Sequence, residues 1–326
     1  MNSQEAQFYL TWVSIGCSLL LFFGLMVFGL FNCHKYIIKQ RGHLLLFYIF
    51  SIFVCCGRIG RLVTIIVNYT IDNEMNSILA VMVDCLIQCS LVVVGMCLCV
   101  LMFQLYTYLQ WNLIALEAAG NLPRMHQIPP RNEQAEEKKK SATFKLSVMK
   151  FVLHVLMVLA FAITGTLLVM TYLKSDYATE NPMTVSFIDF VRSQQSESMY
   201  GLFTLNAVFL YQSILFILTA ALLYTSIYFV ISQISDLQQQ NNLTYQEGSG
   251  SMEKEMKRLK AIMSVFGFSY ILRFAYNFSI SLYELEFAVF QSEHPGFSQL
   301  ILFAYFMVTD ALPIGMVFYM HYMNYR

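Results

Sequence analysis

Residues 78–108 read ILAVMVDCLIQCSLVVVGMCLCVLMFQLYTY, and Asp84 is the one charged residue in this stretch. A helix of about 20 apolar residues crosses the roughly 30 Å hydrocarbon core of a bilayer, because each residue adds about 1.5 Å. The stretch is therefore long enough to cross a membrane as one helix, and it is longer than a crossing requires.

Six further apolar runs flank this stretch, and each is also predicted to be a transmembrane helix. The predicted spans are residues 8–31, 43–68, 78–108, 144–173, 199–231, 259–282 and 297–320. The predicted fold class is all-α, a polytopic membrane protein whose residues 1–326 form a single seven-transmembrane domain. Between the spans, 109–143 is expected to be a largely irregular cytosolic loop. Residues 232–258 are expected to be a second cytosolic loop, flexible at first and helical near 252–260.

The composition of the chain supports lipid as its solvent. Hydrophobic residues make up 57% of the sequence and charged residues only 12%, whereas about a quarter of the residues of a soluble domain are charged. Lysine and arginine together equal aspartate and glutamate in number, at 20 each. Without a basic excess the chain has no means of steering toward nucleic acid, so that class of partner is excluded.

Cationic residues gather on one side of the predicted spans. The residues on that side are Lys35, Lys39, Arg41, Arg124, Arg131, Lys138, Lys139, Lys140, Lys145, Lys150, Lys254, Lys257, Arg258, Lys260 and Arg326. Only Lys174 and Arg192 fall on the other side. Because lysine and arginine favour cytosolic loops, the sequence predicts an N-terminus outside and a C-terminus in the cytosol.

Five charged residues lie at membrane depth within the predicted spans, away from the span ends, namely Arg58, Arg61, Asp84, Arg273 and Asp310. Each costs at least about 2.5 kcal/mol at membrane depth, so such residues usually face the bundle or a wet cavity. Helical rise places Arg58, Arg273 and Asp84 at one level in the outer half, with Asp310 about 10 Å closer to the cytosol.

Two interpretations of these five residues stay open. In the structural one, Asp84 pairs with Arg58 or Arg273 as an interhelical lock. Asp310 then bonds backbone freed by Pro313, and Arg61 extends outward to the interface. In the functional one, three arginines against two aspartates leave a cationic surplus. That surplus would bind an anion such as a carboxylate or a lipid phosphate.

Other candidate sites lie at the ends of the spans. Basic residues predicted to bind a cytosolic partner are Lys138, Lys139, Lys140, Lys254, Lys257 and Arg258. Cys33 follows the first span beside lysines and is a candidate for palmitoylation. Asn68 begins the sequon Asn68-Tyr69-Thr70 and is a candidate for glycosylation.

The sequence argues against an enzyme. No lysine lies in the seventh span to form a retinal Schiff base. A membrane zinc hydrolase needs several His, Asp or Glu ligands at one depth, and only His154 lies well inside a span. We therefore expect no catalytic residues, no cofactor and no metal.

The helices carry short motifs of a known family. They are an arginine in the second span (Arg58 or Arg61), the stretch Leu101–Tyr106, the stretch Phe268–Arg273 and the step Asp310-Ala311-Leu312-Pro313. In these places the chain resembles the plant tobamovirus multiplication proteins and the related animal orphan, receptor-like lysosomal membrane proteins. That family usually carries Glu where this chain has Asp310, and its loops differ. The resemblance implies an endomembrane protein that recruits small GTPases or signalling partners through its cytosolic loops.

The expected function is that of a receptor-like protein, similar to G-protein-coupled receptors in its seven helices. The rhodopsin-like Asp/Glu-Arg-Tyr motif is missing, because the third span ends in Gln104-Leu105-Tyr106. It would sense an external or lipid ligand and engage a heterotrimeric G protein or small GTPase. Two alternatives remain: a ligand-independent endomembrane scaffold for a small GTPase, and an anion or small-solute transporter or membrane-complex subunit. The expected location is the plasma membrane or an endomembrane such as the lysosomal one.

Overall fold

The computed structural model describes residues 3–37, 42–71, 77–120, 133–174, 205–242, 249–283, 286, 289–290 and 293–324. Its elements, in which η marks a π-helix, are α1 (Ser3–Asn32), η1 (Cys33–Ile37), α2 (His43–Ile71), α3 (Ser77–Gly120), α4 (Glu133–Lys174), α7 (Leu205–Asn242), α8 (Ser249–Leu282), α10 (Pro295–Phe306), η3 (Met307–Ala311) and α11 (Leu312–Asn324).

Seven helices in the described part of the chain are long and apolar enough to cross a membrane. They coincide with the seven predicted spans, and α10, η3 and α11 together form the seventh. The prediction of an all-helical, multi-pass membrane protein is therefore confirmed at this level.

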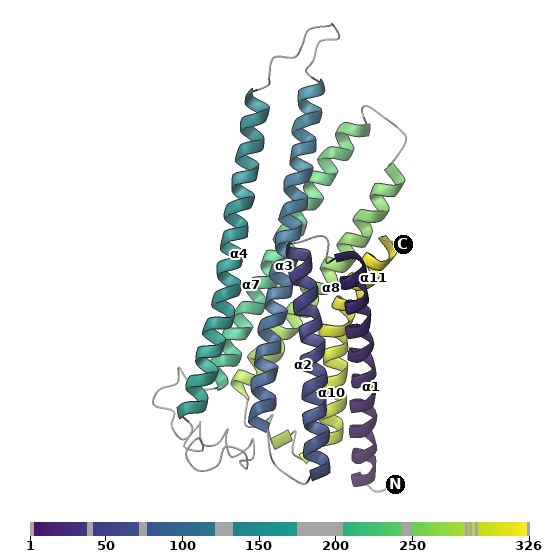
Figure 1. Ribbon diagram of the computed structural model, residues 1–326, viewed down its shortest axis with the longest axis vertical. Coiled ribbons are helices and arrows are strands. Elements are labelled where there is room, and N and C mark those ends of the chain that lie inside the picture. Colours follow the sequence, from purple (N-terminus) through teal and green to yellow (C-terminus); the bar gives the residue numbers. More distant parts are fainter. Residues whose placement is uncertain are drawn as a thin grey trace.

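The helices run alternately up and down the bundle (Figure 1). The N-terminus lies at one end. The starts of α4 and α8 lie at the opposite end, which we call the basic end because it carries Lys138, Lys139, Lys140, Lys257 and Arg258. At the basic end α3, α4, α7 and α8 extend beyond α1, α2 and α11.

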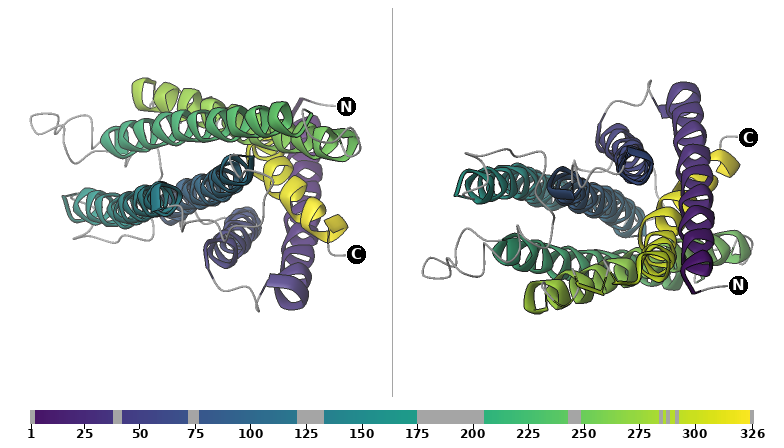
Figure 2. Two further views of the ribbon diagram at one scale, coloured as in Figure 1. Left: turned by 90° about the horizontal axis from the view of Figure 1, so that it is seen from above. Right: turned by 90° about the horizontal axis from the view of Figure 1, so that it is seen from below.

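Helix α3 is the centre of the bundle. It packs against α2, α4 and α7, and it is the most buried of the seven spans. Seen along the bundle axis, α3 lies between α7 and α2, while α1 lies beside α10 (Figure 2). Residues 87–100 of the apolar stretch that predicted the fold are buried on every side by protein, which explains why this part lacks a polar face.

Glycine allows α3 to approach its neighbours closely. A Cβ atom at Gly95 would lie 2.5 Å from Cγ2 of Thr219 and 2.6 Å from the hydroxyl oxygen of Tyr270. That hydroxyl donates a hydrogen bond to the backbone carbonyl of Leu91 on α3. Gly95 therefore makes room for a tyrosine of α8 whose polar end is satisfied by α3.

The two predicted cytosolic loops are more helical than the sequence indicated. Helix α3 continues to Gly120 and α4 starts at Glu133, although residues 109–143 were predicted to be largely irregular. Helix α7 likewise continues to Asn242 and α8 starts at Ser249. The predictions were wrong here because Glu, Gln, Lys and Ala are polar or small yet strong helix formers. The acidic residues that begin α4 also complement its dipole.

Candidate functional site

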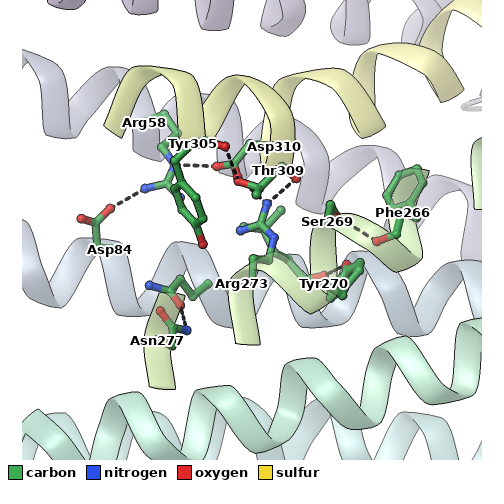
Figure 3. A network of polar contacts seen from close by, with 12 residues as sticks. Arg58, Asp84, Phe266, Ser269, Tyr270, Arg273, Asn277, Tyr305, Thr309 and Asp310 are labelled. Atoms are coloured by element: carbon green, nitrogen blue, oxygen red, sulfur yellow. Dashed lines mark hydrogen bonds and ion pairs between the residues drawn. The ribbon is translucent and has the colours of Figure 1, made fainter. Parts of the chain in front are cut away.

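The five charged residues predicted at membrane depth come together in one place. Figure 3 shows four of them, Arg58, Asp84, Arg273 and Asp310. The five form what we call the arginine–aspartate cluster: Arg58 and Arg61 of α2, Asp84 of α3, Arg273 of α8 and Asp310 of η3. Two consecutive helices from the first half of the chain, α2 and α3, are therefore tied by charge to α8 and η3 near its end.

Asp310 is the deepest member of the cluster and is fully buried. Its Oδ2 accepts a hydrogen bond from Nε of Arg58 at 2.7 Å. Its Oδ1 accepts from Nη2 of Arg273 and from the hydroxyl of Thr309, the latter at 2.8 Å. One carboxylate thus binds two guanidinium groups, which neutralises much of their charge away from water.

Asp84 is the second carboxylate and lies nearer the surface. Its Oδ1 accepts a hydrogen bond from Nη1 of Arg58 at 2.5 Å, so Arg58 bridges both carboxylates. Its Oδ2 lies 2.8 Å from Nε of Arg61. That pair is within ion-pair distance, but its alignment does not meet hydrogen-bond geometry, since Nε of Arg61 has no hydrogen-bond partner among the described residues.

Aromatic rings line the guanidinium groups. The guanidinium carbon of Arg58 lies 3.7 Å from the ring centroid of Phe306, and that of Arg61 lies 5.3 Å from the same ring. Arg273 lies 5.6 Å from the ring of Phe216. Ring faces attract cations and exclude water, so they help to hold the guanidinium groups at membrane depth.

Pro313 leaves one backbone carbonyl without its usual helical donor, and Arg273 binds that carbonyl. Because Pro313 has no N–H, the carbonyl of Thr309 four residues earlier lacks its α-helical donor. The segment around it is the π-helix η3, in which the N–H of Leu312 bonds to Met307, and such bulges recur at functional sites. Nη2 of Arg273 donates to the freed Thr309 carbonyl at 2.5 Å.

The pairing predicted for Asp84 with Arg58 or Arg273 is confirmed, and Arg58 is the partner bonded to it. Two other details of the structural interpretation need correction. The carboxylate of Asp310 does not bond the carbonyl freed by Pro313, because both groups are acceptors, and Nη2 of Arg273 donates to that carbonyl instead. Arg61 does not extend outward alone but pairs with Asp84.

The depth predicted for Asp310 in the membrane stays a prediction. The structure shows that Asp310 is in contact with both Arg58 and Arg273. The long side chains of the two arginines can bridge a difference in level between the helices.

Amide side chains inside the spans were missed because only charged residues were considered, and histidines were considered only as possible metal ligands. The amide of Asn277 donates to Oε1 of Gln88 across α8 and α3, and Nε2 of Gln212 donates to the Cys85 carbonyl at 3.0 Å. On the basic-end side, the Nε2 atoms of His43 and His154 lie 3.2 Å apart. Amides and histidines within apolar runs are the signal that would have found them.

The remaining predicted site residues lie outside the arginine–aspartate cluster. Lys138, Lys139, Lys140, Lys257 and Arg258 are exposed at the basic end. Lys254 is in the first turns of α8 and Asn68 near the end of α2, but their side chains are outside the described part. Cys33 begins η1 as a half-buried free thiol. Its palmitoylation stays a prediction.

Among the described residues, no group of three or more His, Cys, Asp or Glu side chains is arranged to hold a metal ion. Comparison with protein-family models, curated proteins and solved structures finds no match. The resemblance to the tobamovirus multiplication protein group therefore stays a prediction. The arginine–aspartate cluster is the strongest candidate for a functional site among the described residues.

Proposed function

We propose that the protein is a receptor-like signalling membrane protein, in which the arginine–aspartate cluster controls the position of α8 and so the binding of a cytosolic partner at the basic end. One observation carries the proposal. Helix α8 is continuous from Ser249 to Leu282, so Lys257 and Arg258 share one helix with Arg273. The distance along that helix from Arg258 to Arg273 is about 22 Å.

The contacts of Arg273 make α8 a candidate for a two-state element. Arg273 is buried and holds α8 to η3 through the carboxylate of Asp310 and the carbonyl of Thr309. Separating a buried pair leaves an uncompensated charge, at a cost of about 3–5 kcal/mol. A signal that supplies another partner for one of these charges would lower that cost and let α8 shift.

The basic end has the charge and the shape for docking. Its cationic side chains lie on α4 and α8, which together with α3 and α7 extend beyond α1, α2 and α11 at this end (Figure 1). In the orientation that the lysine and arginine bias favours, this end faces the cytosol. An acidic surface of a heterotrimeric G protein or small GTPase is the partner that such a surface would steer.

The test is affinity purification in mild detergent with identification of the captured proteins. We expect Lys257→Glu/Arg258→Glu to abolish capture of the cytosolic partner, because charge reversal replaces attraction by repulsion. The matched control is Glu293→Lys, an exposed charge reversal on the opposite side of the bundle. It should leave capture unchanged. The yield of folded protein should be the same in both variants as in wild type.

The role of the cluster is tested separately from that of the basic end. Arg273→Gln removes the contact between α8 and η3, so we expect it to change the amount of captured partner several-fold. Capture that is identical in wild type and Arg273→Gln would contradict the proposed coupling. It would favour instead a ligand-independent scaffold that binds its partner through the basic end alone.

A further inference from the structure

The arginine–aspartate cluster carries more positive than negative charge. Three guanidinium groups face two carboxylates among the described residues, which leaves a formal surplus of one positive charge. Arginine does not lose its proton in proteins, so the surplus cannot be removed by deprotonation. At this depth an uncompensated charge is costly, and the cluster is electrostatically complete only with one more anion.

The surplus is located at Arg61. Asp310 is shared by Arg58 and Arg273, and Arg58 also takes the hydrogen bond to Asp84. Arg61 is left with a misaligned contact between its Nε and Oδ2 of Asp84. Within the described part of the chain its two Nη groups make no hydrogen bond, so one edge of its donor fork is unused.

Arg61 is also the accessible member among the three arginines. Arg58 and Arg273 are at most 2% exposed, whereas Arg61 is 14% and its neighbour Asp84 is 17% exposed. Arg61 lies about 9 Å along the helix from Val67, where the span of α2 ends. That places its long side chain within reach of headgroup depth in the leaflet opposite the basic end.

We propose that Arg61 binds one phosphate oxyanion, supplied by the headgroup of an anionic lipid or by free phosphate. The planar guanidinium donates in parallel to two oxygens of a phosphate, which suits the unused edge of Arg61. Phosphate bound there competes with Asp84 for Arg61 and so changes the charge that Asp84 offers to Arg58. This inference rests on the proposed function, because it names the ligand class of the same cluster.

Native mass spectrometry and thermal unfolding of the purified full chain test the inference. Protein in neutral detergent is titrated with phosphatidic acid, with phosphatidylcholine and with inorganic phosphate. We expect one phosphatidic acid to bind, at least about tenfold more tightly than phosphatidylcholine, because only the former carries a net charge that offsets the surplus. Binding of inorganic phosphate at the same site would identify the free anion as sufficient, and its failure to compete would identify the lipid.

The variants separate a phosphate site from a structural contact. Arg61→Gln should weaken phosphatidic acid binding about ten- to hundred-fold, in line with the loss of charged hydrogen bonds. Arg61→Lys keeps the charge and should retain part of the affinity for phosphatidic acid. This variant still tests the inference if Arg61→Gln does not fold. Lys260→Gln, an exposed cation on the opposite side of the bundle, is the control and should bind as wild type.

Equal affinity in wild type, Arg61→Lys and Arg61→Gln would overturn the inference, as would equal binding of phosphatidic acid and phosphatidylcholine. The assay contains no cytosolic partner. A negative result would therefore remove the phosphate site while leaving partner capture at the basic end untouched, and failure of partner capture would leave the binding result intact.

Discussion

At the scale of single residues, Asp310 decides whether the arginine–aspartate cluster is stable. It is fully buried and bonds Arg58 and Arg273 at once. Two guanidinium groups so close together repel each other unless a carboxylate lies between them. The carboxylate of Asp310 therefore stabilises the cluster in two ways: it accepts hydrogen bonds from both arginines, and its negative charge offsets their mutual repulsion.

We expect Asp310→Asn to destabilise the protein by about 3–5 kcal/mol, because it leaves buried cations without a counter-charge. Adding Arg273→Gln should restore part of that loss, since one of the two cations is then gone. The measurement is a double-mutant cycle on the free energy of unfolding in mixed micelles. Additive losses from the two substitutions would contradict the ion pair.

Gly95 gives a second prediction at this scale, based on space and not on charge. Gly95→Ala should cost about 1–3 kcal/mol, because its methyl group would overlap the hydroxyl of Tyr270. The matched control is Gly165→Ala in α4, where a Cβ atom meets nothing within 4 Å. Unfolding measurements should show the control to be neutral or slightly stabilising, as alanine favours helix. Equal effects of the two substitutions would show that α3 and α8 do not cross so closely.

At the scale of secondary-structure elements, the sequence predicted which segments are helices better than where they end. All seven spans were predictable because hydrocarbon demands about 20 apolar residues in a row. Their ends were not, since hydropathy reports where lipid stops and not where the helix does. Residues 110–120 of α3 and 133–143 of α4 are polar or mixed in composition and nevertheless helical.

The arginine–aspartate cluster shows the same division. Its membership was predictable, because a charge in an apolar run has few places to go other than the bundle interior. Its pairing was predicted only in part: Asp84 was expected to bond Arg58 or Arg273, but the contacts of Asp310 depend on a local distortion of the seventh helix. The π-helix η3 and the carbonyl freed by Pro313 decide where Asp310 points and what Arg273 bonds, and no count of helical rise contains either of them.

Pro313→Ala tests that distortion directly. The new N–H at position 313 can donate to the carbonyl of Thr309. It then competes with Arg273 for that carbonyl. We therefore expect Arg273→Gln to cost clearly less stability in the Pro313→Ala background than in wild type. Pro295→Ala, at the start of α10 where a missing N–H costs nothing, is the control background and should leave the cost unchanged. An equal cost in all three backgrounds would mean that the freed carbonyl contributes nothing to holding α8.

At the scale of the whole molecule, both proposals depend on which way the bundle lies in its membrane. The helices alternate in direction, with the N-terminus at the end opposite the basic end (Figure 1). A bundle inserted with the basic end outside would expose its docking surface to the wrong compartment. It would also place Arg61 in the cytosolic leaflet, where anionic lipids are more abundant.

The distribution of charge predicts the orientation, which can be measured independently of any ligand or partner. Positive residues near the ends of spans resist translocation, and the basic end carries them on both α4 and α8. We expect an epitope tag at Met1 to be protected from protease in sealed microsomes and a tag at Arg326 to be digested. Detergent should make both accessible, which is the control for sealing. Neutralising Lys138, Lys139 and Lys140 together should weaken the charge bias and produce a fraction of inverted molecules. Digestion of the Met1 tag in the wild type without detergent would contradict the predicted orientation.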